Sequence, residues 1–345
     1  MIKIKEVSDK RAWSLFLNQI EPFPYFQSWN WSEVLERLGD KVLRFGVYDP
    51  KNNLIGVFLV NKVKAKRGNY LHVRHGPVFL KFNLSHFDNV LNYIKNIAVI
   101  ENASFIRISP LVKRDDINIE FFKKREFREA PSHNMDAEIC WVLDITKSEN
   151  ELLREMRKTH RYLIKKGKTL DIEIIRSTNA ADIKRFLPLY SNLSKRKHFV
   201  PHKGIAEEFG VFEKDNEAVL FLAKYPPNGE AGKNKIISGA LVVYVSNTAI
   251  YRHGASSSQY RNIPASYLLQ WEAILEAKKR GKKTYNFWGI APNDSKRHPW
   301  QGLTLFKTGF GGQRLEFLHA QDLPLNLWYF KTWAVEYIAK IIKGY

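Results

Sequence analysis

The sequence has 345 residues, of which 44% are hydrophobic and 13% are aromatic, and this content excludes a globally disordered chain. The length fits two domains of moderate size. The 55 Lys and Arg residues outnumber the 35 Asp and Glu residues, which gives a formal net charge of +20. Such a charge attracts polyanions, so we expect nucleic acid, an anionic membrane surface or a phosphorylated substrate as a partner. The alternative is a basic protein that its charge keeps soluble.

No stretch of 18 apolar residues occurs, so the sequence predicts no transmembrane segment. The N-terminal residues are charged from the start and lack the apolar centre of a secretory signal. The single cysteine, Cys140, cannot form an internal disulfide or a zinc cluster. It lies in a mostly apolar run, which favours a buried strand residue over a nucleophile. We therefore expect a cytoplasmic protein.

In chain order, predicted helices and strands alternate. The first half contains an amphipathic helix over 28–38 and strands over 43–48, 54–58 and 70–73, and these are followed by a helix over 87–97 and a strand over 105–109. The second half repeats the three strands over 219–225, 236–241 and 250–254, and continues with a helix over 264–280 and a strand over 284–288. Each set of three strands ends in Arg-His-Gly. We interpret this as an internal duplication of an α/β unit.

A strong helix is predicted over 148–166, between the two halves. Ser148 and Glu151 form a capping-box pattern at its start, and Gly167 is its expected stop. Basic residues at helical spacing predict a phosphate-binding stripe on one side, and a solvated helix face is the alternative. The stripe consists of Arg154, Arg157, Lys158, Arg161 and Lys165.

The segment that follows the strand over 250–254 has the layout of an acyl-CoA pyrophosphate site, with a polar loop leading into a helix. In acetyltransferases this loop is rich in glycine, so that backbone N–H groups can approach the pyrophosphate. Here the positions after Arg261 carry no glycine, and Pro264 has no N–H to donate. The sequence therefore predicts an acetyltransferase scaffold with a disabled coenzyme site and no cofactor.

The segment 285–312 combines large aromatic residues with five glycines, and this favours a binding loop over a core. Lys307 lies between Phe306 and Phe310. A lysine among aromatic rings is partly desolvated and can place a cation beside developing negative charge. The alternative is a lysine that extends to solvent. The ten histidines show no metal-ligand spacing, so we expect no metal.

Several segments resemble the Fem family (FemA, FemB and FemX), which builds peptidoglycan cross-bridges from aminoacyl-tRNA. The resemblance covers essentially the whole chain and rests on residues 26–31, 157–166, 251–256, 285–290 and 298–312. It implies a mixed α/β fold of two tandem acetyltransferase-like (GNAT) domains. The first domain is expected at 1–146, with 317–345 returning to it so that the C-terminal helix packs on it. The second is expected at 147–316.

The resemblance also implies the reaction, in which an amino acid moves from aminoacyl-tRNA to an amine of a peptidoglycan precursor that is linked to UDP or to a lipid. By the same resemblance, Lys307 stabilises the oxyanion with Phe306 beside it, and Tyr251 lines the site. A fixed donor at such an oxyanion contributes on the order of 3 kcal/mol. Further candidates for substrate binding are Asn286, Trp288 and Trp300.

Two positions depart from the family pattern. Many relatives carry a phosphate-binding lysine where this sequence has Leu35, and Arg37 is the nearest basic residue. An arginine and a tyrosine of the family are absent around 198–209, where His202 is the nearest polar candidate. Two other functions stay open, namely an acyl-CoA N-acyltransferase and a non-catalytic protein that binds RNA or a membrane surface. The C-terminal helix can touch a membrane or pack on the first domain.

Overall fold

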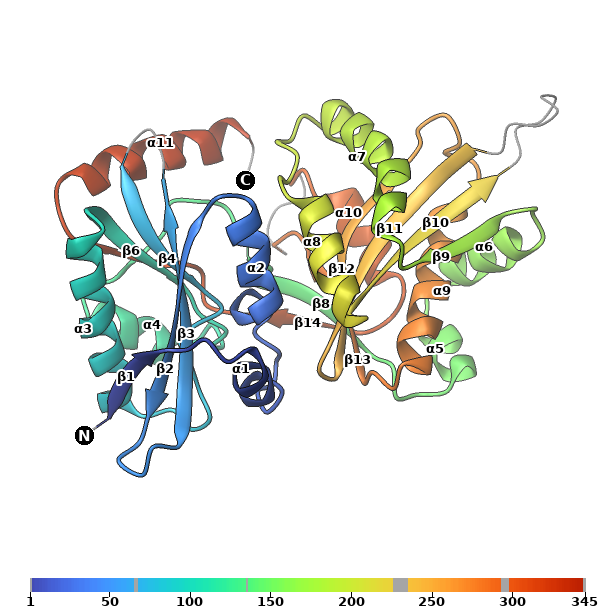
Figure 1. The fold of residues 1–345 in the computed structure, drawn as a ribbon. Helices are drawn as coiled ribbons and strands as arrows, with labels where there is room; N and C mark the ends of the chain where they lie inside the picture. The colour runs from blue at the N-terminus through green and yellow to red at the C-terminus, as the bar shows by residue number, and fades with distance from the viewer. Residues whose placement is uncertain (1, 65–67, 135, 226–234, 293–297, 344–345) are drawn as a thin grey trace. The chain divides into compact units, whose positions relative to one another are not determined.

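The computed structural model describes residues 2–64, 68–134, 136–225, 235–292 and 298–343 (Figure 1). Helices and strands alternate along the chain and form two mixed β-sheets, which confirms the predicted α/β class. Within the described residues, no helix combines the length and the apolar character needed to cross a bilayer. Nor do these residues include a group of three or more His, Cys, Asp or Glu side chains placed to hold a metal ion.

The chain divides into two compact units. The first comprises Met1–Ile139, Ala291–Gln301 and Leu315–Tyr345, and the second comprises Cys140–Ile290 and Gly302–Arg314. This division differs from the expected boundary at residue 146, because the strand that begins at Ile139 pairs with a strand of the second sheet. It also differs at residues 291–301, which group with the first unit.

The sheet of the first unit has seven strands in one continuous order, and the short strand β5 pairs with β3 outside this order. The order along the path is β1-β2-β3-β4-β6-β15-β7, and β4 and β6 are its parallel pair. Its elements are β1 (Lys3–Glu6), α1 (Lys10–Leu17), a 3-10 turn (Tyr25–Gln27), α2 (Trp29–Arg37), β2 (Lys41–Tyr48), β3 (Leu54–Val63), β4 (Asn69–Arg74), β5 (Val78–Phe79), α3 (Leu84–Ile100), β6 (Ala103–Ser109), α4 (Asp116–Lys123), β7 (Arg128–Glu129), β15 (Gln321–Pro324) and α11 (Trp328–Ile342).

The side chains of β6 point alternately to the two faces of the first sheet, and their contacts show which helices cover each face. Ile106 and Ile108 belong to the apolar core that includes residues of α3 and α4. Phe105 and Arg107 point to the opposite face, where the Phe105 ring lies 5.2 Å from the ring of Tyr329 in α11. The C-terminal helix therefore packs on the first sheet, as the sequence predicted.

A buried ion cluster fixes α11 to this sheet. The guanidinium of Arg107 donates to Asp322 of β15 at 2.6 and 2.8 Å. It also donates to Glu336 of α11 at 2.8 Å. Arg107 and Asp322 are buried, so Asp322 depends on Arg107 for its charge partner. Glu336 of α11 therefore faces the protein.

The second unit contains the other sheet, in the order β14-β8-β13-β12-β11-β10-β9. Its elements are β8 (Ile139–Asp144), α5 (Glu149–Glu155), α6 (Lys158–Lys168), β9 (Glu173–Ser177), a 3-10 turn (Ala180–Asp182), α7 (Ile183–Lys197), α8 (Ile205–Phe212), a 3-10 turn (Glu213–Asp215), β10 (Ala218–Tyr225), β11 (Lys235–Val245), β12 (Thr248–Ser256), α9 (Ala265–Lys279), β13 (Thr284–Gly289), α10 (Gln301–Thr308) and β14 (Gln313–Glu316).

The two units share one plan. In the first, antiparallel β2-β3-β4 is followed by α3 and by β6, which is parallel to β4. In the second, antiparallel β10-β11-β12 is followed by α9 and by β13, which is parallel to β12. The predicted duplication is therefore confirmed. Cys140 is a buried residue of β8, also as predicted.

Two predicted elements are wrong. The helix over 148–166 is broken into α5 and α6, because Met156 and Arg157 are extended, with ψ of 151° and 144°. The Arg157 N–H donates to the carbonyl of Gly309 at 2.9 Å instead of continuing a helix. Gly167 lies inside α6, which ends at Lys168.

The segment after residue 300 forms a helix instead of the expected loop. Residues 301–308 form α10, and the clustered glycines follow that helix. Phe310 is fully buried in the core of the second unit. The sequence pattern was misleading here because the glycines serve close packing after the helix rather than a mobile loop.

Candidate active site

The candidate site of the second unit lies where β12 and β13 part. Their parallel ladder has three residue pairs and ends at Ile250 and Asn286, while the strands continue to Ser256 and Gly289. Each strand is also irregular at this end. The register of β12 against β11 shifts at Arg252, and that of β13 against β8 shifts between Asn286 and Gly289. Such bulges bend a strand and redirect its side chains.

Lys307 of α10 lies against both strands beyond their paired residues. Its ammonium donates to the carbonyl of Gly289 at 2.7 Å and lies 5.8 Å from the ring centre of Tyr251. The residue is only 4% exposed, and no carboxylate of the described residues forms an ion pair with it. Burial lowers the pKa of Lys307 from its ordinary 10.5 to about 7, although the nearby Cys140 thiol opposes the shift. An ammonium has three N–H donors, and the carbonyl of Gly289 accepts a hydrogen bond from one of them.

Tyr251 forms a wall of the site beside the ammonium. Its hydroxyl packs on Gly254 so closely that a Cβ at that position would lie 1.7 Å from the oxygen. The glycine of the Arg-His-Gly sequence is therefore required by the tyrosine. Burial raises the pKa of Tyr251 well above its ordinary value, so that the phenol stays neutral and can donate a hydrogen bond.

Trp288 occupies an unusual backbone conformation next to the lysine's anchor. Its φ is +67°, in the left-handed region that bulky residues rarely adopt. The Asn286 side chain accepts the Trp288 N–H at 2.8 Å, and the Arg252 guanidinium lies 4.5 Å from the Trp288 ring centre. These contacts hold a strained turn, and strain of this kind gathers at functional sites. The turn is followed by Gly289, whose carbonyl accepts the hydrogen bond from the ammonium of Lys307.

Cys140 is close to the lysine but is not suited to be a nucleophile. Burial raises the pKa of its thiol to about 12, and the charge of Lys307 and a hydrogen bond with Asn286 only partly oppose this. The thiolate is the reactive form of cysteine. At neutral pH the group is therefore a protonated thiol inside the core.

Sequence reasoning missed a buried carboxylate behind the site. Glu208 of α8 pairs with the Arg252 Nε at 2.6 Å and with the His253 Nε2 at 2.9 Å. These neighbours hold the pKa of Glu208 far below its usual range despite its burial. The ring of His202, which is exposed, lies 5.5 Å from that of His253. His202 thus borders this cluster rather than Lys307.

A signal for this pairing was present in the duplication. In the first unit, the matching Arg74 donates its Nε to Asp136 at 2.9 Å, and Asp136 is buried. Each Arg-His-Gly sequence therefore uses its arginine to bind a buried acid. A repeated arginine in this position predicts a carboxylate partner, but the sequence does not tell which distant acid it is.

α6 holds the end of α10, and this explains part of the basic sequence 157–166. Arg157 donates to the carbonyl of Leu305 at 3.0 Å and to the Thr308 hydroxyl at 2.8 Å. His160 donates its Nε2 hydrogen to the carbonyl of Phe306 at 2.9 Å. A Cβ on Gly309 would lie 1.9 Å from the His160 ring, so this contact requires glycine. A cation at the C-terminus of α10 is also favoured by the helix dipole.

Phe306 lies in an aromatic cluster on α10. Its ring centre is 5.1 Å from that of Tyr267 and 5.3 Å from that of Phe310. These contacts anchor α10 in the core of the second unit. The geometry thus gives Phe306 a packing role beside Lys307.

The residues of the predicted basic stripe differ in their contacts. Arg161 donates to the carbonyls of Arg154 and Met156 at 3.0 and 2.7 Å, so it caps the end of α5. Arg157 is engaged with α10. The side chains of Arg154, Arg157, Lys158 and Lys165 are exposed and form no ion pair among the described residues, and Arg157 alone of these four also binds α10.

Two predicted residues belong to the first unit. Arg37 is exposed at the last position of α2, and the nearby Leu35 is buried in the core. The position where relatives carry a lysine thus has no side chain at the surface. Trp300 lies with its ring centre 5.3 Å from that of His298 and 6.1 Å from that of His133.

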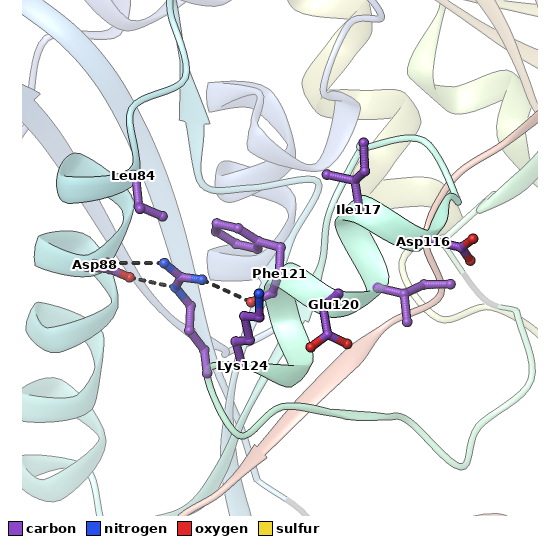
Figure 2. A pocket seen from close by; sticks show the side chains of 9 residues that line it. Leu84, Asp88, Asp116, Ile117, Glu120, Phe121 and Lys124 are labelled. Atoms are coloured by element: carbon purple, nitrogen blue, oxygen red, sulfur yellow. Dashed lines mark hydrogen bonds and ion pairs between the residues drawn. The ribbon is translucent and has the colours of Figure 1, made fainter.

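An open hollow lies between α3 and α4 of the first unit (Figure 2). Its apolar lining includes Leu84, Ile117 and Phe121. The charged residues Asp88 and Arg125 pair with each other at 2.6 Å. None of the predicted site residues lines this hollow, so the parting of β12 and β13 is the better candidate.

Comparisons with known proteins show the family and the fold of the chain. The model of the FemAB family matches residues 10–135 and 218–337. The lipid II:glycine glycyltransferase of Staphylococcus haemolyticus is 23% identical over 339 residues, which cover 79% of this chain and 81% of that protein. The enzyme of the same name from Staphylococcus aureus strain USA300 is 22% identical over 370 residues, which cover 86% of this chain and 87% of that protein.

Solved structures show the same fold. The crystal structure of FemX has a TM-score of 0.81 at 18% identity and covers 96% of this chain and 99% of its own. A tandem GNAT protein from the clavulanic acid biosynthesis pathway has a TM-score of 0.58 at 8% identity and covers 94% of this chain and 98% of its own. Because the family model matches well over half of the sequence, the chain belongs to the FemAB family.

Proposed function

We propose that this protein is an aminoacyltransferase that moves an amino acid from aminoacyl-tRNA to the stem peptide of a peptidoglycan precursor. The observation that carries the proposal is the buried ammonium of Lys307, which has no carboxylate partner among the described residues and donates to the carbonyl of Gly289 beside Tyr251. Membership of the FemAB family supports the same class of reaction. The names of the two staphylococcal relatives make glycine and lipid II the first pair to test.

The chemistry needs few protein groups. The acceptor amine attacks the ester carbonyl, its nitrogen bonds to the carbonyl carbon, and negative charge collects on the carbonyl oxygen. When the intermediate collapses, the bond to the tRNA ribose oxygen breaks and the amine's proton passes to that oxygen. In this proposal the ammonium of Lys307 donates to the oxyanion, and the negative charge raises the lysine's pKa and keeps it protonated. The neutral phenol of Tyr251 lies beside it.

Replacement of the lysine tests this role. Lys307→Met should lower the transfer rate by about 100-fold or more, because a missing oxyanion donor costs on the order of 3 kcal/mol. The affinity for tRNA should change by less than about twofold, because one buried side chain adds little to phosphate binding. The measurement is transfer of radiolabelled amino acid from charged tRNA to lipid-linked and UDP-linked precursors, alongside tRNA binding.

The matched control is Lys279→Met, which removes an exposed lysine at the end of α9 and should leave both quantities unchanged. Retention of full transfer by Lys307→Met would refute the proposed role. An equal loss of transfer and of tRNA affinity would show that the lysine acts in binding instead.

The pH dependence follows from the lowered pKa. Lys307 loses its proton as the pH rises through about 7 in the free enzyme, so its contribution to kcat/KM should decline above that value. The acceptor amine and the α-amino group of the aminoacyl ester titrate equally in both assays, so the ratio of wild-type to Lys307→Met kcat/KM isolates the lysine. We expect this ratio to fall between pH 7 and pH 9. A constant ratio over this range would contradict the assignment.

The exposed basic residues of α5 and α6 should bind tRNA phosphates. Replacing Arg154, Lys158 and Lys165 each by Gln should weaken tRNA binding and reduce the slope of log affinity against log salt by roughly one per lost contact. Arg157→Gln should instead slow transfer with little change in the slope, because Arg157 holds α10. The measurement is tRNA binding across a series of KCl concentrations. Equal slopes for all four variants would exclude this division of roles.

A further inference from the structure

α11 presents its apolar side chains outward. On its inner side, Tyr329 and Thr332 are buried, and Glu336 binds Arg107. On the outer side, Ile338 is 54% exposed, Ile341 is 60% exposed and Ile342 is 78% exposed. These residues recur at helical spacing with two aromatic residues. We call this surface the outer face of α11, and it consists of Phe330, Lys331, Tyr337, Ile338, Ile341 and Ile342.

The charges on and around the outer face have one sign. Lys331 is exposed on this face and forms no ion pair with a described residue. Lys340 and Lys343 lie on the Glu336 side of the helix, near His133. The one acidic residue of the helix, Glu336, is engaged by Arg107 on the inner side. Arg128 adds a guanidinium 5.6 Å from the ring centre of Phe330. An apolar stripe with cations along it is complementary to lipid chains below anionic head groups.

We propose that the outer face of α11 docks on the surface of a bilayer rich in anionic phospholipid. The helix has 15 residues, about 22 Å at 1.5 Å per residue, which is shorter than a bilayer's apolar core. It therefore lies along the interface, with its isoleucines among the upper parts of the lipid chains. The buried pair with Arg107 keeps the polar side of the helix on the protein during this contact.

Other occupants fit this face less well. A second copy of the chain would bring lysines against lysines on two molecules that each carry a net charge of +20. Nucleic acid would leave the exposed isoleucines against a polar backbone, and an apolar face of this kind gains nothing there. The docking does not depend on the proposed aminoacyl transfer, so its failure would leave that proposal intact.

The test is flotation of the full chain with vesicles on a density gradient. We expect binding to vesicles of phosphatidylglycerol and phosphatidylethanolamine, and much weaker binding to vesicles of phosphatidylcholine. The double variant Ile338→Glu and Ile341→Glu should reduce the floated fraction by roughly tenfold or more, because it places two carboxylates among lipid chains. Lys331→Glu should lower the floated fraction severalfold, because it reverses the charge of the lysine on the outer face.

The matched control is Ile117→Glu with Ile119→Glu on α4, which also carries exposed isoleucines but packs on the opposite face of the first sheet (Figure 2). This variant should float as the wild type does. If the α11 isoleucine variant melts early, the lysine variant decides the question. Absence of wild-type binding to anionic vesicles, full binding by both α11 variants, or an equal loss in the α4 control would overturn the proposal.

Discussion

The second unit is organised around the burial of one lysine without a carboxylate. Because the pKa of Lys307 falls from 10.5 in an unfolded chain to about 7 in the folded protein, the unfolded chain binds more protons between these values. The free energy of unfolding therefore rises with pH across this window. The destabilisation caused by burying the charged ammonium is fully present below pH 7. A shift of this size corresponds to a few kcal/mol, to order of magnitude. The rest of the fold must offset that cost, and a bound oxyanion would relieve it.

The contacts around α10 hold the buried lysine in place. Arg157 and His160 bind carbonyls of its last turn, and Gly309 allows the His160 ring to approach. From the opposite side, the turn at Trp288 sets the carbonyl of Gly289 against the ammonium. The lysine is therefore fixed at both ends of its side chain before any substrate arrives. Such preorganisation is the main way in which enzymes stabilise developing charge.

Local patterns predicted the repeated strands, the helix bounded by Pro264 and Gly281, and the buried Cys140, because each depends on periodicity or on caps. The break after Met156 could not be predicted in this way, since it depends on a hydrogen bond to Gly309 far along the chain. The same holds for Glu208, whose partner Arg252 is 44 residues away. Lys307 was identified through family resemblance and its aromatic neighbours, but its helix was hidden by the glycines that follow.

The central claim is that Lys307 is an ammonium poised to meet an oxyanion, and its own titration tests this most directly. Lysines labelled with ¹³C at Cε would be followed by NMR across pH, with Lys307→Met to assign the resonance. The account predicts a midpoint near 7 in the free protein, and a clear upward shift when a phosphonate analogue of the tetrahedral intermediate binds. A midpoint near 10.5 in both states would contradict it.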